Sequence, residues 1–305
     1  MAQQGYRLVA PSRSHEHSNP STFILLGIPG LETAHIWISI PFCATYAIAV
    51  LGNFTILFIV KMEPNLCGPM FFFLCMLAVT DLVMSTSTVP KMLSIFWFNS
   101  RESSFSAYLT QMYFVHSLSG MESGILVAMA FDRYVDICHP LRHSTTLTNS
   151  VVAKIGLAVV LRSGIFALPY PFLHRAVGKL ACADISISSY YGLFHLLSEI
   201  RMEGFFIAMS YTQILRAIFC LPTKDARLKT FGTCISHLCA ISALYIPDLF
   251  YSLMLRFGHN VPLHFLILIV NLYHLIPPVL HHIIYGVRAK QIQDRLLQLF
   301  THKET

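Results

Sequence analysis

Charged residues are scarce in this sequence of 305 residues: only 12% are Asp, Glu, Lys or Arg, whereas 55% are hydrophobic. The mean hydropathy is +0.60. So few charges cannot give a water-soluble domain its polar surface, and the composition therefore favours an integral membrane protein. No short apolar core with a small-residue cleavage site lies in the polar stretch 1–20, so we expect no cleavable signal peptide and insertion directed by the first spanning helix.

The sequence also lacks the motifs of catalysis. No metal-ligand cluster, nucleophile motif or phosphate-binding glycine loop stands out, so we expect no enzyme, no cofactor and no metal site. The adjacent His281 and His282 cannot share an ion by themselves, because neighbours on a helix point about 100° apart. The net charge of +6 does not indicate nucleic-acid binding, since the basic residues are scattered along the borders of apolar segments.

Extracellular cysteine is scarce as well. Of the eight cysteines, only Cys182 lies clearly outside the apolar runs on the extracellular side. It has no evident partner, so we predict no extracellular disulfide within the chain.

Apolar runs long enough to cross a bilayer recur along the chain, which predicts an all-α bundle of seven transmembrane helices. Basic residues gather in the loops on one side, which places that side in the cytoplasm and the N-terminus outside. No internal repeat is visible, so we expect one domain over 1–305, with an extracellular segment 1–36 and a cytoplasmic tail 288–305. Basic and apolar positions alternate over 289–300, which suits an amphipathic helix on the inner leaflet. The predicted spans are 37–60, 70–98, 108–137, 151–173, 188–219, 228–255 and 261–287.

An acid, a base and a phenol follow one another where the third span should leave the membrane. These are Asp132, Arg133 and Tyr134. Charges at the edge of a span are costly enough to indicate function. One interpretation pairs Arg133 with Asp132 to close the inner face, and the alternative is an interfacial arginine that reaches the lipid headgroups. Asp136 adds an acid beside this group that could hold Arg133 in an inactive pair.

Other polar residues lie at membrane depth. Asn53 and Asp81 are tolerable there only if they face the bundle and share water or a cation, or bond to each other and fix helix packing. The fifth span carries Glu199, Arg201 and Glu203, each costing about 2.5 to 3.5 kcal/mol near the bilayer centre. Glu199 and Glu203 share a face while Arg201 points elsewhere, so we expect no pair within this span to offset the cost.

Several motifs together resemble one family. The stretch 129–143 is similar to the third-helix end of odorant receptors, a branch of the rhodopsin-like G-protein-coupled receptors, and 116–122 resembles their class I, fish-like branch. The other matching motifs, in chain order, are Gly52-Asn53, 77–82, Ser210-Tyr211, 229–238, Pro277-Pro278 and 283–286.

The resemblance implies a pocket for a small volatile ligand in the outer half of the bundle, between spans three, five, six and seven. The class I branch suggests short carboxylic acids. Arg256 stands where related receptors hold an acid headgroup, which a guanidinium can bind bidentately. The alternative is an arginine that anchors its helix at the interface. His116 is a second candidate for the pocket, or else a satisfied core histidine.

The resemblance also implies the partners and the switch. These are a heterotrimeric G protein of the stimulatory olfactory type and the lipids of the plasma membrane. Activation would swing the sixth span outward and release Arg133 from Asp132, with Tyr134, Tyr211 and Tyr285 as further switch residues.

Some positions depart from the family. Tyr108 replaces the cysteine that begins the third helix, and the loop before Cys182 is short. His281 and His282 replace an Asn-Pro pair, so a kink should be lost and the inner end of that helix should be straighter. These departures favour, as an alternative, a decayed receptor copy that inserts into membranes but signals poorly. A transporter or channel is a further alternative, although the paired half-repeats of such folds are not visible.

Overall fold

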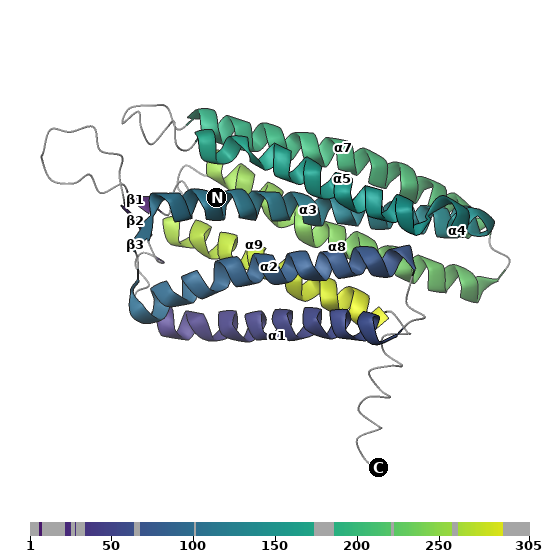
Figure 1. Cartoon of the computed structure of the whole chain (residues 1–305), viewed down its shortest axis with the longest axis horizontal. Helices are drawn as coiled ribbons and strands as arrows, with labels where there is room; N and C mark the ends of the chain where they lie inside the picture. The colour runs from purple at the N-terminus through teal and green to yellow at the C-terminus, as the bar shows by residue number, and fades with distance from the viewer. Residues whose placement is uncertain are drawn as a thin grey trace, which may run out of the picture.

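The computed structural model describes residues 6–7, 22–25, 28, 34–63, 68–100, 102–173, 186–220, 223–257 and 262–288. Within them, seven long helices lie lengthwise in an elongated bundle (Figure 1). The predicted seven-helix membrane bundle is confirmed, and the predicted ends lie within a few residues of the observed ones. The long helices are α1 His35–Met62, α2 Pro69–Phe98, α3 Phe105–Cys138, α5 Asn149–Ala167, α7 Ser186–Phe219, α8 Lys224–Phe257 and α9 Leu263–Arg288.

Hydropathy explains most of these helices. In the described part of the chain, five are long and apolar enough to cross a membrane: α1, α2, α3, a span from Asn149 to Leu173 that contains α5, and α8 as far as Met254. The remaining two, α7 with 34 residues and α9 with 26, are long enough to complete the bundle. Large apolar side chains remain exposed around the outside, as expected where lipid replaces water.

Short-range chemistry sets several helix ends. Pro69 begins α2 directly after the extended Gly68, where a missing backbone donor costs nothing. Asn99 ends α2 in the left-handed conformation with φ of 52°, and its backbone N–H bonds back to the last turn. α3 begins at Phe105, three residues before the predicted start at 108. Its N-cap is Ser104, whose hydroxyl accepts a hydrogen bond from the N–H of Ala107 at 3.2 Å.

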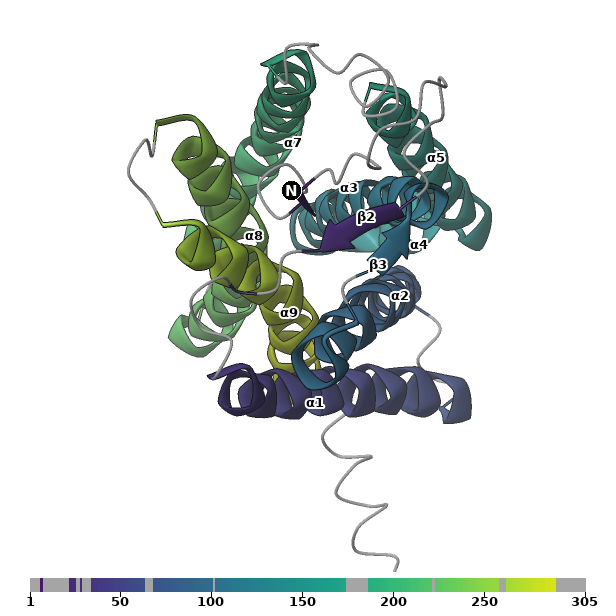
Figure 2. The same cartoon turned by 90° about the vertical axis from the view of Figure 1, so that its left-hand side faces the viewer.

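The third helix lies inside the bundle. It packs against α2, α5, α7 and α8, while α1 packs against α2 and α9. Figure 2, which looks along the bundle, shows the other helices around α3. Buried side chains of the long helices form one large apolar cluster, and residues such as Ile125 and Leu126 of α3 are fully buried in it. The polar groups on the inner faces are therefore surrounded largely by apolar side chains.

Shorter elements complete the fold. An antiparallel sheet of β1 Tyr6–Arg7, β2 Thr22–Leu25 and β3 Glu102–Ser104 lies against the start of α3 (Figure 2). No strand was predicted in the segment 1–36, so the all-α prediction is incomplete there. After α3, the chain turns through η2 Pro140–Arg142 and α4 His143–Thr146. The predicted amphipathic helix at 289–300, Cys182 and the short loop before it lie outside the described residues.

Candidate functional site

The acid and the base at the inner end of α3 are held by different partners. Asp132, only 2% exposed, lies 3.0 Å from Nε2 of His143 in α4. Arg133 pairs with Asp136 through Nη1 and Oδ2 at 3.4 Å, and its Nη2 contacts the sulfur of Met70. The predicted pair between Arg133 and Asp132 is therefore wrong, because adjacent helical residues diverge whereas residues three apart share a face. The alternative pair with Asp136 is the one that forms.

The candidate switch tyrosines lie in two places. The hydroxyl of Tyr211 in α7 is 2.6 Å from Nδ1 of His237 in α8. The ring of Tyr285 in α9 lies 6.1 Å from that of His237, and its buried hydroxyl has no hydrogen-bond partner within the described ranges. His237 therefore connects three helices at the inner half. Tyr134 lies apart from this group and bonds to His139 at 3.3 Å.

The polar residues Asn53 and Asp81 each attach to α9. Asn53 donates to the carbonyl of Ala49 at 3.0 Å and to that of Pro278 at 3.2 Å. Both carboxylate oxygens of Asp81 lie 3.2 Å from Nδ1 of His281, and neither side chain is more than 1% exposed. Of the two alternatives for these residues, the bond between Asn53 and Asp81 does not form, because each has a partner on α9 instead.

The two histidines of α9, which stand in place of the family's Asn-Pro pair, each contact another helix. His281 supplies the partner of Asp81, and His282 packs directly on Gly52 of α1. A Cβ atom at Gly52 would lie 2.2 Å from Cδ2 of His282, so a larger residue cannot fit without displacement of the ring. α9 continues past both residues to Arg288. Neither contact could be predicted from the sequence, since each joins segments far apart along the chain.

Glu122 of α3 adds a second carboxyl group near Asp81. It is 3% exposed and interacts electrostatically with Asp81, and its Oε1 has no hydrogen-bond partner among the described residues. No group of three or more potential metal ligands is found in the described part of the chain. Asp81, His281 and Glu122 thus form a buried polar site in which two carboxyl groups lie near one imidazole.

A larger charged network is centred on the two acids of the fifth span, α7, and joins α7 to α3, α5 and α8. Glu203 of α7 is 2% exposed and is contacted by Arg162 of α5 and by the hydroxyl of Tyr245 of α8. Ser123 of α3 donates to it at 3.2 Å, and Arg162 also lies 3.6 Å from Glu199. The expectation concerned pairs within the fifth span only, and the observed pair lies outside that span. The cation comes from a neighbouring helix, which periodicity within one helix cannot reveal.

The predicted ligand groups lie toward the other end of the bundle. His116 is half-buried, and its ring stacks on that of Tyr170 with centroids 3.7 Å apart and planes 7° apart. Tyr108, at the position of the missing cysteine, is buried in a cluster with Met112 and Tyr170. Arg256 belongs to the last turn of α8, but its side chain is outside the described residues.

Comparisons with known proteins match almost the whole chain. The sequence model of the family described as olfactory receptor matches residues 42–303. Olfactory receptor 52R1 of Homo sapiens is 52% identical over 299 residues, which cover 92% of this chain and 95% of that protein. Olfactory receptor 51E1 of Homo sapiens is 47% identical over 301 residues, with 93% and 94% covered. Olfactory receptor 51E2 of Mus musculus is 45% identical over 298 residues, with 92% and 93% covered.

Proposed function

Because this chain belongs to the olfactory receptor family, we propose that it binds a small volatile ligand and activates a heterotrimeric G protein of the stimulatory olfactory type. The chain is a multi-pass membrane protein and a G-protein-coupled receptor of olfaction, not an enzyme. Membership of this family also argues against the alternative that the chain is a transporter or channel.

The proposed topology is a single domain in the plasma membrane. The segment 1–36 lies outside the cell and the tail 288–305 lies in the cytoplasm, where it contacts membrane lipids. The distribution of basic residues supports this orientation, since Arg142, Lys224, Arg227 and Arg288 fall at one end of the bundle.

The proposed ligands are short carboxylic acids, bound by Arg256 and His116. A guanidinium binds a carboxylate with two parallel hydrogen bonds, and a pocket without bulk water strengthens them. His116 lies at the outer end of α3 on an aromatic wall formed by Tyr170, which supports a mixed apolar and polar pocket.

The proposed switch is the release of Arg133. The observation that carries this proposal is that Arg133 is held by Asp136 and Met70, while Asp132 is held by His143. Activation then separates Arg133 from Asp136. The outward movement of α8 carries His237 away from Tyr211 and Tyr285 and opens the inner face to the G protein.

Asn53 and Asp81 are proposed to fasten α9 to α1 and α2. Two hydrogen bonds from Asn53 and the buried contact between Asp81 and His281 support this role over a cation site.

A decayed receptor copy remains the alternative. The specific observation that favours it is again Asp136, whose pair with Arg133 keeps the switch arginine occupied.

The test measures cyclic AMP in cells that express the full chain together with the stimulatory olfactory G protein, on a panel that includes short carboxylic acids. Surface labelling in the same cells separates trafficking from signalling. A dose-dependent rise that Arg256→Ala abolishes at equal surface level supports the receptor and its ligand class, with Arg201→Ala as the matched arginine control. A surface-expressed chain that answers no ligand supports the decayed copy.

A further inference from the structure

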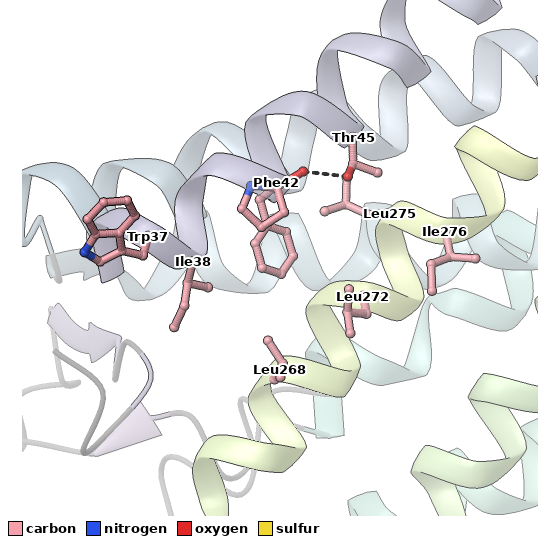
Figure 3. Close-up of a pocket in the computed structure, with 9 residues that line it drawn as sticks. Trp37, Ile38, Phe42, Thr45, Leu268, Leu272, Leu275 and Ile276 are labelled. Carbon is pink, nitrogen blue, oxygen red and sulfur yellow. Dashed lines mark hydrogen bonds between the residues drawn. The ribbon is translucent and has the colours of Figure 1, made fainter. Parts of the chain in front are cut away.

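A groove runs between α1 and α9 on the outside of the bundle. Its volume is about 460 Å³, which lies within the range of small-molecule sites. Figure 3 shows Ile38 and Phe42 projecting from α1 toward α9, and Leu268 and Leu272 projecting back toward α1. The full lining is Trp37, Ile38, Pro41, Phe42, Thr45, Leu268, Leu272, Leu275 and Ile276.

The position of the groove indicates that a lipid-phase molecule contacts it. Both helices cross the membrane, and the lining extends from Trp37 near the start of α1 to Thr45, about 12 Å along the helix axis. One leaflet contributes about 15 Å of hydrocarbon. The groove therefore reaches from the headgroup region most of the way to the bilayer centre. Trp37 is 74% exposed at its mouth, where tryptophan favours the interface.

The polar groups of the groove that concern its occupant lie on α1. Pro41 has no backbone N–H, so it cannot donate to the carbonyl of Trp37 four residues earlier. Both residues line the groove. The one side-chain hydroxyl in the lining, that of Thr45, donates to the carbonyl of Pro41 at 2.6 Å. A carbonyl that has lost its helical donor is unfavourable in lipid, so this end of the groove favours an occupant that donates a hydrogen bond.

We propose that the groove between α1 and α9 binds a membrane sterol, with its hydroxyl group at the carbonyl of Trp37 and its rings on Phe42 and Leu272. Phosphatidylcholine has no hydrogen-bond donor and cannot satisfy that carbonyl. A sterol has one hydroxyl donor on an otherwise apolar body. This distribution matches a lining in which the Trp37 carbonyl lacks the helical donor that Pro41 cannot supply, while Phe42 and Leu275, 3% and 2% exposed, provide hydrocarbon surface deeper in the groove.

The test is photolabelling of the full chain in lipid vesicles with a photoreactive sterol, followed by mapping of the labelled peptides. We expect label on α1 and α9, and competition by cholesterol about two to ten times stronger than by its 3-keto analogue, which accepts but does not donate. Pro41→Ala restores a backbone donor to the carbonyl of Trp37, so it should make the two competitors equal. No odorant or G protein takes part, so this result is independent of the proposed signalling.

Leu272→Trp fills the groove and should remove this label. Ile40→Trp adds the same side chain to α1 at a residue that is 55% exposed and outside the lining, and should leave the label unchanged. Four results would each overturn the proposal: label unaffected by Leu272→Trp, equal competition by the two sterols in the unaltered chain, competition by phosphatidylcholine, or capture of a second copy of the chain at this face.

Discussion

The charged network around Glu203 allows the most quantitative prediction. Arg162→Met removes the cation from a carboxylate that is 2% exposed. Removal of one partner of a buried ion pair typically costs about 3 to 5 kcal/mol. Tyr245 and Ser123 continue to donate to Glu203, so we expect the lower end, about 3 kcal/mol of unfolding free energy.

Two further variants test the same ion pair: a control on the same helix, and a double variant that should restore stability. Lys154→Met removes a cation from an exposed position of the same helix α5 and should change stability by less than about 0.5 kcal/mol. The double variant Arg162→Met with Glu203→Gln removes both charges, so most of the lost stability should return, because a neutral amide still accepts hydrogen bonds.

The assay is thermal unfolding of each purified variant in the same lipid nanodisc, together with the fraction of chain that reaches the cell surface. An Arg162→Met variant as stable as Lys154→Met would refute the assignment of Arg162 as the partner that stabilises Glu203. A double variant no better than Arg162→Met would show that the loss comes from packing and not from an uncompensated charge.

Three further predictions concern the switch, the ligand and helix packing. Asp136→Ala should raise ligand-independent cyclic AMP by up to about fivefold, because a partly exposed pair with Arg133 is worth at most about 1 kcal/mol; an unchanged basal level at equal surface expression contradicts this. Arg256→Ala should abolish responses to short fatty acids while surface expression is retained, and an unaltered dose-response curve would remove Arg256 from the pocket. Gly52→Ala should cost about 1 to 3 kcal/mol in thermal unfolding, since its methyl group would overlap His282; no recovery on addition of His282→Ala would place the strain elsewhere.

Hydropathy alone located the helices well. The second span was predicted at 70–98 and is observed at Pro69–Phe98, because twenty or more apolar residues have few alternatives to a membrane helix. The start of α3 at Phe105 depends on the Ser104 hydroxyl, a local contact that hydropathy does not register. The two- to four-residue strands β1, β2 and β3 are too short to leave a pattern.

The candidate site was harder to predict, because its partners lie on different helices. The sequence indicated that Asp132 and Asp81 were costly enough to be functional or hydrogen-bonded, and that Glu203 had no partner on its own helix. It did not indicate that His143, His281 and Arg162 are their partners, since these contacts depend on how each helix is rotated against its neighbours. The pair between Arg133 and Asp136 was accessible to prediction, because both residues belong to one helix and lie three positions apart.

This chain is an olfactory receptor, and we propose that its activation requires release of Arg133 from Asp136. Ligand-stimulated nucleotide exchange on the stimulatory olfactory G protein tests it most directly, with the folded receptor in nanodiscs and a panel of odorants that includes short carboxylic acids. We expect at least one odorant to accelerate exchange, and Asp136→Ala to increase the rate further. Exchange that stays at the receptor-free rate for every odorant, in both the unaltered chain and Asp136→Ala, would contradict it.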